Sequence, residues 1–154
     1  MSALRMLYNS LIYPNLTYGN SLWGAATQRV LNPLIVAQKK IVRAICRKPR
    51  RFHTAPLFHD LHFLNITQIN RYASCLYTFK SLQRGEEWTV LVNIPYPTRR
   101  NVAPTIVVPP VMLTHSRQSG RWVGIQTWNA LPAEIRILDS YRLFKVNLKR
   151  YLIG

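Results

Sequence analysis

Half of the ten prolines in this 154-residue chain are crowded into 16 positions. These are Pro95, Pro97, Pro104, Pro109 and Pro110. Proline lacks a backbone N–H and clashes with the preceding helical turn, so this density excludes a helix and favours an extended connector. The sequence therefore predicts three parts, a helical region at residues 1–88, a Pro-rich extended connector at 89–118 and a C-terminal helical block at 119–154. Within the connector, residues 106–108 are expected to pair briefly as a strand.

The clearest helical signal covers about residues 28–48, between Thr27 as the expected N-cap and Pro49 as the expected stop. Its aliphatic residues fall within an arc of about 120° at 100° per residue. They are Leu31, Leu34, Ile35, Ile41, Val42 and Ile45. Four cations, Lys39, Lys40, Arg43 and Arg47, occupy an arc of similar width on the other side. One face is therefore predicted to pack on a core and the other to meet water or phosphate.

Three further helices complete a predicted mostly α-helical fold. The first covers residues 2–13 and is expected to end at Pro14. The next begins at Asn65, where Gln68 three residues later completes a capping box, and Gly85 is the expected C′ residue. The last covers residues 141–152 and carries a basic stripe of Arg142, Lys145 and Lys149. Residues 52–64 are predicted to be a short turn-rich stretch.

The charge of the chain is strongly one-sided. Its 21 Lys and Arg face only five Asp and Glu, which gives a formal net charge of +16. Seven of the cations fall within residues 39–51, without one acid. They are Lys39, Lys40, Arg43, Arg47, Lys48, Arg50 and Arg51. Solvated helix faces usually mix both signs, so this run predicts contact with nucleic-acid phosphates; a solvated face or a membrane surface are the alternatives.

The scarcity of acids excludes several classes of enzyme. The only carboxylates are Asp60, Glu86, Glu87, Glu134 and Asp139, whereas a two-metal site needs several in one cluster. No Gly-x-Ser-x-Gly or Gly-rich phosphate loop occurs. Five possible zinc ligands, Cys46, His53, His59, His62 and Cys75, fit no common spacing. We therefore expect no catalytic residue, no metal and no cofactor.

Other signals place the chain inside the cell, in the nucleus or cytoplasm. No apolar stretch reaches the roughly 18 residues of a transmembrane helix, and no signal peptide is recognised. The two cysteines make no disulfide framework and are expected to be free thiols in helices. Four tryptophans and eight tyrosines could stack on bases, although aromatic residues more often fill cores.

Two sequence blocks resemble the C-terminal part of reverse transcriptases from non-LTR (LINE-type) retrotransposons, downstream of the polymerase palm. The first block reads LYNSLIYP at residues 7–14, LTYGN at 16–20 and WG at 23–24. The second reads WNALPAEIR at residues 128–136 and is followed by Phe144-Lys145 and Leu148-Lys149. The resemblance covers nearly the whole chain, in order.

This resemblance implies an RNA-directed DNA polymerase context. Residues 1–88 would be a thumb-like helical bundle that grips the template–primer backbone, and the upstream polymerase domain of the parent polyprotein would be a second partner. The aromatic-x-Asp-Asp motif of the palm is absent, so the palm carboxylates would lie upstream of Met1 and the chain would be no enzyme on its own. A free-standing basic RNA- or DNA-binding module and a decayed, non-functional reading frame remain alternatives.

Overall fold

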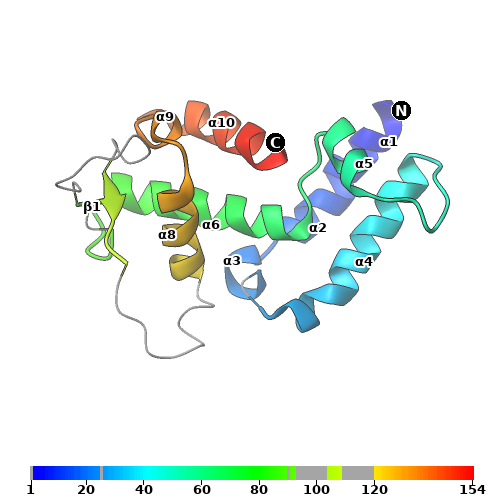
Figure 1. The fold of residues 1–154 in the computed structure, drawn as a ribbon, viewed down its shortest axis with the longest axis horizontal. Helices are drawn as coiled ribbons and strands as arrows, with labels where there is room; N and C mark the ends of the chain where they lie inside the picture. Colours follow the sequence, from blue (N-terminus) through cyan, green and yellow to red (C-terminus); the bar gives the residue numbers. More distant parts are fainter. Residues whose placement is uncertain (1, 25, 90, 93–103, 109–119) are drawn as a thin grey trace. The chain divides into compact units, whose positions relative to one another are not determined.

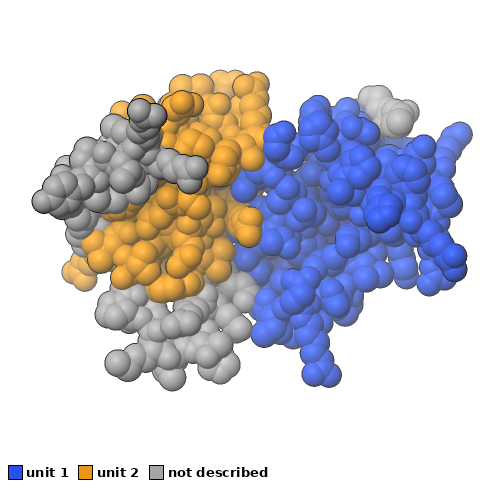
Figure 2. Space-filling view, viewed as in Figure 1, with its two compact units in different colours: residues 1–70, 152–154 blue, residues 71–151 orange. Residues whose placement is uncertain are grey.

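Helices dominate the fold, as the hydrophobic periodicity predicts (Figure 1). The structure is a computed structural model, and it describes residues 2–24, 26–89, 91–92, 104–108 and 120–154. The predicted connector therefore lies largely outside the described residues. The described residues form two compact units, unit 1 with residues 1–70 and 152–154 and unit 2 with residues 71–151 (Figure 2). The predicted division into residues 1–88, 89–118 and 119–154 stays a prediction.

The sequence predicted that the N-terminal helix ends at Pro14, but the helix continues past this residue. Helix α1 (Ser2–Leu7) continues into a π-helical turn, η1 (Tyr8–Ile12), and then into α2 (Tyr13–Thr17). In the π turn the Tyr13 N–H donates to the Tyr8 carbonyl five residues earlier. Pro14 then lies in the first turn of α2, where its missing N–H costs no hydrogen bond. The prediction was wrong because a wider turn can absorb a proline that an uninterrupted α-helix cannot.

Unit 1 continues with three helices before α6. They are α3 (Asn20–Trp23), α4 (Gln28–Ile45) and α5 (Ala55–Asp60). Thr27 is the N-cap of α4, as predicted, although its side chain makes no capping hydrogen bond. Helix α5 was not predicted, because six residues are too few to show helical periodicity. Pro56 in its first turn is the local signal for its start.

Helix α6 (Ile66–Gln83) has both of its predicted ends. The Gln68 N–H donates to Asn65 Oδ1 at 3.0 Å, and the Asn65 N–H donates to Gln68 Oε1 at 2.9 Å, which is the predicted capping box. At the other end Gly85 has φ +66, and the Glu86 N–H donates to the Ser81 carbonyl at 3.1 Å. Together with the bond from the Gly85 N–H to the Leu82 carbonyl at 3.1 Å, this forms a Schellman motif, in which glycine adopts the left-handed conformation without strain.

Among its described residues, unit 2 adds a small antiparallel sheet and three helices to its part of α6. Strand β1 (Leu91–Val92) pairs with β2 (Thr105–Ile106), with Leu91 opposite Ile106. Helices α8 (Gly120–Ala130), α9 (Ala133–Arg136) and α10 (Tyr141–Ile153) follow. The predicted last helix is confirmed to within one residue, and the predicted strand at residues 106–108 forms only at Ile106.

Each unit has its own apolar core. The core of unit 1 gathers side chains from the N-terminal helix, α4, α5 and the start of α6, among them Tyr8, Val42, Phe58 and Ile69. In unit 2 three aromatic rings meet: Phe79 stacks on Phe144 at 4.3 Å between centroids, and Trp128 lies 5.4 Å from Phe144. Phe144 and Leu148 are fully buried, so the predicted apolar side of the last helix packs on this core.

Candidate nucleic-acid interface

Helix α4 turns one side to the core and carries Lys39 and Lys40 on its exposed side. Leu31 and Val42 are buried, and the other predicted aliphatic residues of the helix are half-buried. The predicted two-faced character of this helix is therefore confirmed. The seven cations of residues 39–51 are called the basic cluster from here on.

Gln38 lies in the middle of the apolar face of α4, and the sequence pattern did not predict its role. Its side chain is 2% exposed. Its Nε2 donates to Tyr8 Oη and to the Leu64 carbonyl, both at 2.9 Å, and its Oε1 accepts from the Ile66 N–H at 3.1 Å. One amide therefore ties α4 to the N-terminal helix and to the start of α6. The signal was a glutamine with aliphatic residues three positions before it and four and seven positions after it.

Helix α4 ends at Ile45, three residues before the predicted end, in a second Schellman motif. The Lys48 N–H donates to the Arg43 carbonyl at 2.9 Å, and the Arg47 N–H donates to the Ala44 carbonyl at 3.1 Å. Arg47 is the C′ residue and has φ +51, a conformation that glycine favours and arginine rarely adopts. Arg47 and Lys48 therefore belong to this turn and not to the helix face where the sequence placed Arg47.

Phe52 braces the loop that carries the rest of the basic cluster. Arg43 Nε donates to the Phe52 carbonyl at 2.9 Å, and Lys48 Nζ lies 5.1 Å from the centroid of the Phe52 ring. Arg43 is half-buried as a result, whereas Arg50 and Arg51 are exposed. Arg43 and Lys48 therefore contact Phe52 and fix the shape of the loop, and Lys48 stays exposed together with the other five cations of the basic cluster.

Carboxylates do not neutralise the basic cluster. Unit 1 contains nine Lys and Arg but a single acid, Asp60. Asp60 Oδ1 lies 3.7 Å from Nδ1 of its neighbour His59. All five acids of the chain fall within the described residues, and none of them forms an ion pair with a residue of the basic cluster. The end of α4 is therefore an uncompensated positive surface.

The second predicted basic group, Arg142, Lys145 and Lys149, lies on α10 in unit 2. Arg142 and Lys145 are exposed and Lys149 is half-buried. They follow one another at helical spacing beside the buried Phe144 and Leu148, so the predicted stripe exists as a helix face. This stripe and the basic cluster belong to different units.

The sequence predicted no metal site among its five possible zinc ligands. His59 and His62 have ring centroids 6.4 Å apart, and within the described ranges no group of three or more His, Cys, Asp or Glu side chains is placed to hold a metal ion. Cys75 is buried, and burial raises the pKa of its thiol well above the usual range. The thiol is therefore a core group of α6.

No helix in the described part of the chain has the length and apolarity to cross a membrane.

The WNALPAEIR block has structural roles in unit 2. The Asn129 side chain bonds both backbone groups of Ile106, accepting from its N–H at 3.0 Å and donating to its carbonyl at 2.9 Å. Arg136 Nη1 donates to the Pro104 carbonyl at 3.2 Å. Trp128 and Leu131 are buried. The block therefore fixes strand β2 through side-chain hydrogen bonds.

In the comparisons with known proteins, the chain matches no protein-family model, no curated protein and no solved structure.

Proposed function

We propose that unit 1 binds the phosphate backbone of a nucleic acid through the basic cluster and performs no catalysis. The supporting observation is the uncompensated charge at the end of α4. Six of the seven cations are exposed, and within the described residues none is paired with a carboxylate. A polyanion would neutralise them and release its own counterions on binding, which drives association without reading the sequence of bases.

Stabilisation of the helix terminus does not account for this surface. Cations near a helix C-terminus interact favourably with its dipole, but the effect fades within the last turn. Lys39 and Lys40 lie more than one turn before Ile45, and Arg50 and Arg51 lie beyond Pro49. Arg47 moreover occupies a left-handed position that glycine would fill with less strain. An arginine in this strained position supports a role for its charge.

The sequence resemblance supplies the context of the proposal. We infer a C-terminal fragment of a non-LTR retrotransposon reverse transcriptase, whose polymerase domain would be the second partner. The positions of the acids support a non-catalytic role for this part of the polymerase, because Asp60 lies beside His59 and Glu86 accepts a hydrogen bond from Trp88. A free-standing RNA- or DNA-binding module would use the same surface. A decayed reading frame would instead lack a cooperative unfolding transition.

Salt dependence of binding tests the proposal. The purified chain would be titrated against a fluorescein-labelled RNA–DNA duplex, and the anisotropy would be followed at several salt concentrations. Each phosphate contact adds about −0.9 to the slope of log affinity against log salt. Changing Lys39, Lys40 and Arg47 to Gln should therefore flatten the slope by about 2 to 3. Arg43 is left intact because it braces the loop.

A control variant separates the cluster from total charge. Arg29, Arg71 and Arg150 are exposed cations outside the cluster, and changing all three to Gln removes the same charge. The control should keep most of the wild-type slope. Equal flattening by both triple variants would show that binding follows net charge alone, and salt-independent affinity would refute phosphate contact. Extension of an annealed primer by the purified chain would contradict the absence of catalysis.

A further inference from the structure

Unit 2 presents two stacked aromatic rings at its surface. The rings of Tyr77 on α6 and Trp88 after it are nearly parallel, at 13°, with centroids 5.8 Å apart. Tyr77 is 38% exposed, and Trp88 is half-buried. The aromatic trio of the core lies elsewhere, around Phe144. Tyr77 and Trp88, together with the cations Lys80, Arg84 and Arg121, are called the stacking patch.

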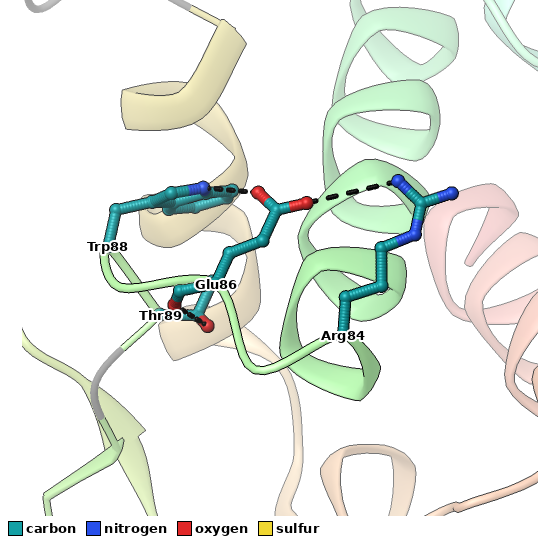
Figure 3. A network of polar contacts seen from close by, with 4 residues as sticks. All are labelled: Arg84, Glu86, Trp88 and Thr89. Carbon is teal, nitrogen blue, oxygen red and sulfur yellow. Dashed lines mark hydrogen bonds and ion pairs between the residues drawn. The ribbon is translucent and has the colours of Figure 1, made fainter.

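A local network holds Trp88 in place (Figure 3). Its Nε1 donates to Glu86 Oε2 at 2.6 Å, and Thr89 Oγ1 donates to the Glu86 carbonyl at 2.6 Å (Figure 3). Glu86 itself follows Gly85 in the Schellman motif that ends α6. The polar atom of the indole is therefore already bonded, and its ring is fixed before any ligand arrives. A rigid ring loses little conformational entropy on binding.

Three cations flank the two rings, and Lys80 Nζ itself lies over the ring of Tyr141, 4.9 Å from its centroid. The Arg121 guanidinium carbon lies 5.5 Å from the centroid of Trp88, and Arg84 Nη1 lies 3.9 Å from Glu86 Oε1. Lys80 follows Tyr77 by three residues on α6, so the two share a helix face. Arg84 offsets the charge of Glu86, whereas Glu87, exposed next to Trp88, is a second carboxylate beside the patch. Exposed rings among cations are the combination that single-strand-binding surfaces use, with stacking for bases and charge for phosphates.

We propose that the stacking patch binds single-stranded nucleic acid, with an unpaired base stacked on Tyr77 and the neighbouring phosphates close to Lys80 and Arg84. This inference goes beyond the proposed function, which requires only charge and lies in unit 1. A duplex keeps the faces of its bases inside its own stack, so only a single strand or an unpaired end can use the patch. Stacking is tolerant of sequence, because every base has a π face.

Abasic oligonucleotides test the stacking directly. The full chain would be titrated with fluorescein-labelled oligo-dT and with an abasic oligonucleotide of equal length, which has the same phosphates but no bases. Oligo-dT should bind about tenfold more tightly, as expected for loss of one stacked base. Tyr77→Ala and Tyr77→Leu should each remove most of this preference, whereas Tyr77→Phe should keep it. Tyr18→Ala is the matched control, because Tyr18 is the more exposed tyrosine, at 85%, and lies in unit 1.

The outcomes separate this proposal from the first one. Equal affinity of the wild-type chain for the two oligonucleotides would overturn the stacking proposal, as would an unchanged preference in both Tyr77→Ala and Tyr77→Leu. In the variant with Lys39, Lys40 and Arg47 changed to Gln, the affinities for oligo-dT and for the abasic oligonucleotide should fall by the same factor. The ratio of the two affinities should therefore stay the same. A wild-type chain that did not bind the RNA–DNA duplex but still preferred oligo-dT to the abasic oligonucleotide would refute the proposed function alone.

Discussion

Replacing Gly124 with alanine should destabilise unit 2, although alanine is the better helix former. Gly124 is buried in α8, against α6. A Cβ added there would lie 2.8 Å from the Ser74 carbonyl oxygen and closer still to Thr78 Oγ1. The hydroxyl cannot rotate away without loss, because it bonds the Ser74 carbonyl at 3.0 Å. The added methyl group therefore has to push the two helices apart.

The expected loss follows from three contributions. Overpacking of a close contact costs about 1–3 kcal/mol. Loss of the Thr78–Ser74 hydrogen bond costs about 1 kcal/mol more. The higher helix propensity of alanine offsets about 1 kcal/mol. The net loss should be about 1–3 kcal/mol, and the melting temperature should fall by about 2–4 °C per kcal/mol in a chain of this size.

Urea denaturation followed by far-UV circular dichroism measures this loss. Gln126 is exposed on the same helix, so comparing Gly and Ala at that position gives the propensity difference alone. In a Thr78→Ala background the closest overlap is gone, and Gly124→Ala should cost about 1 kcal/mol less than in the wild type. A neutral or stabilising Gly124→Ala, equal to the change at Gln126, would refute the close packing of α6 and α8.

Two further predictions concern the hydrogen bonds of single side chains. Gln38→Met keeps the side-chain volume but leaves Tyr8 Oη and two buried backbone groups without their partner. Urea denaturation should therefore show that the free energy of unfolding falls by about 3 kcal/mol or more. Gln28→Met, at an exposed position of the same helix, should change it by no more than about 0.5 kcal/mol. The hydrogen bond from the Trp88 indole N–H is the largest cause that lowers the pKa of Glu86. A carboxyl group whose pKa is lowered in the folded state adds stability at pH values above its unfolded-state pKa. This stability is lost as the pH falls through the folded-state pKa. Trp88→Phe should therefore raise the pKa of Glu86, measured by NMR titration, and its stability deficit should shrink in acid; an unchanged Glu86 titration would show that the indole bond is absent in solution.

The sequence predicted those parts of the fold that depend on neighbouring residues. The capping box of Asn65 and Gln68 and the C′ role of Gly85 were found because each needs only residues within one turn. The two-faced character of α4 was found because aliphatic spacing follows the helix period. The mostly α-helical fold class was predicted from the same helical spacing and is confirmed by the structure.

What the sequence missed depends on contacts between distant residues or on conformations that break a local preference. Gln38 looked polar and exposed because its three partners lie 26 to 30 residues away. The left-handed Arg47 could not be predicted, since the preference at a C′ position is for glycine. The sequence identified the seven cations of the basic cluster but placed Arg47 on the helix face, and the contacts of Arg43 and Lys48 with Phe52 depend on a residue across the loop.

Helix α6 belongs to both units, and this has a consequence for how the chain can be cut. The boundary between the units falls between Asn70 and Arg71, inside the continuous helix Ile66–Gln83. Ile69 on one side and Cys75 on the other are fully buried, each in its own core. A truncation at this boundary would leave five residues of the helix on one piece and thirteen on the other, each with an unfinished core. The two units therefore share one element that neither can lose, and a shuffling event or a trimmed expression fragment has to take them together.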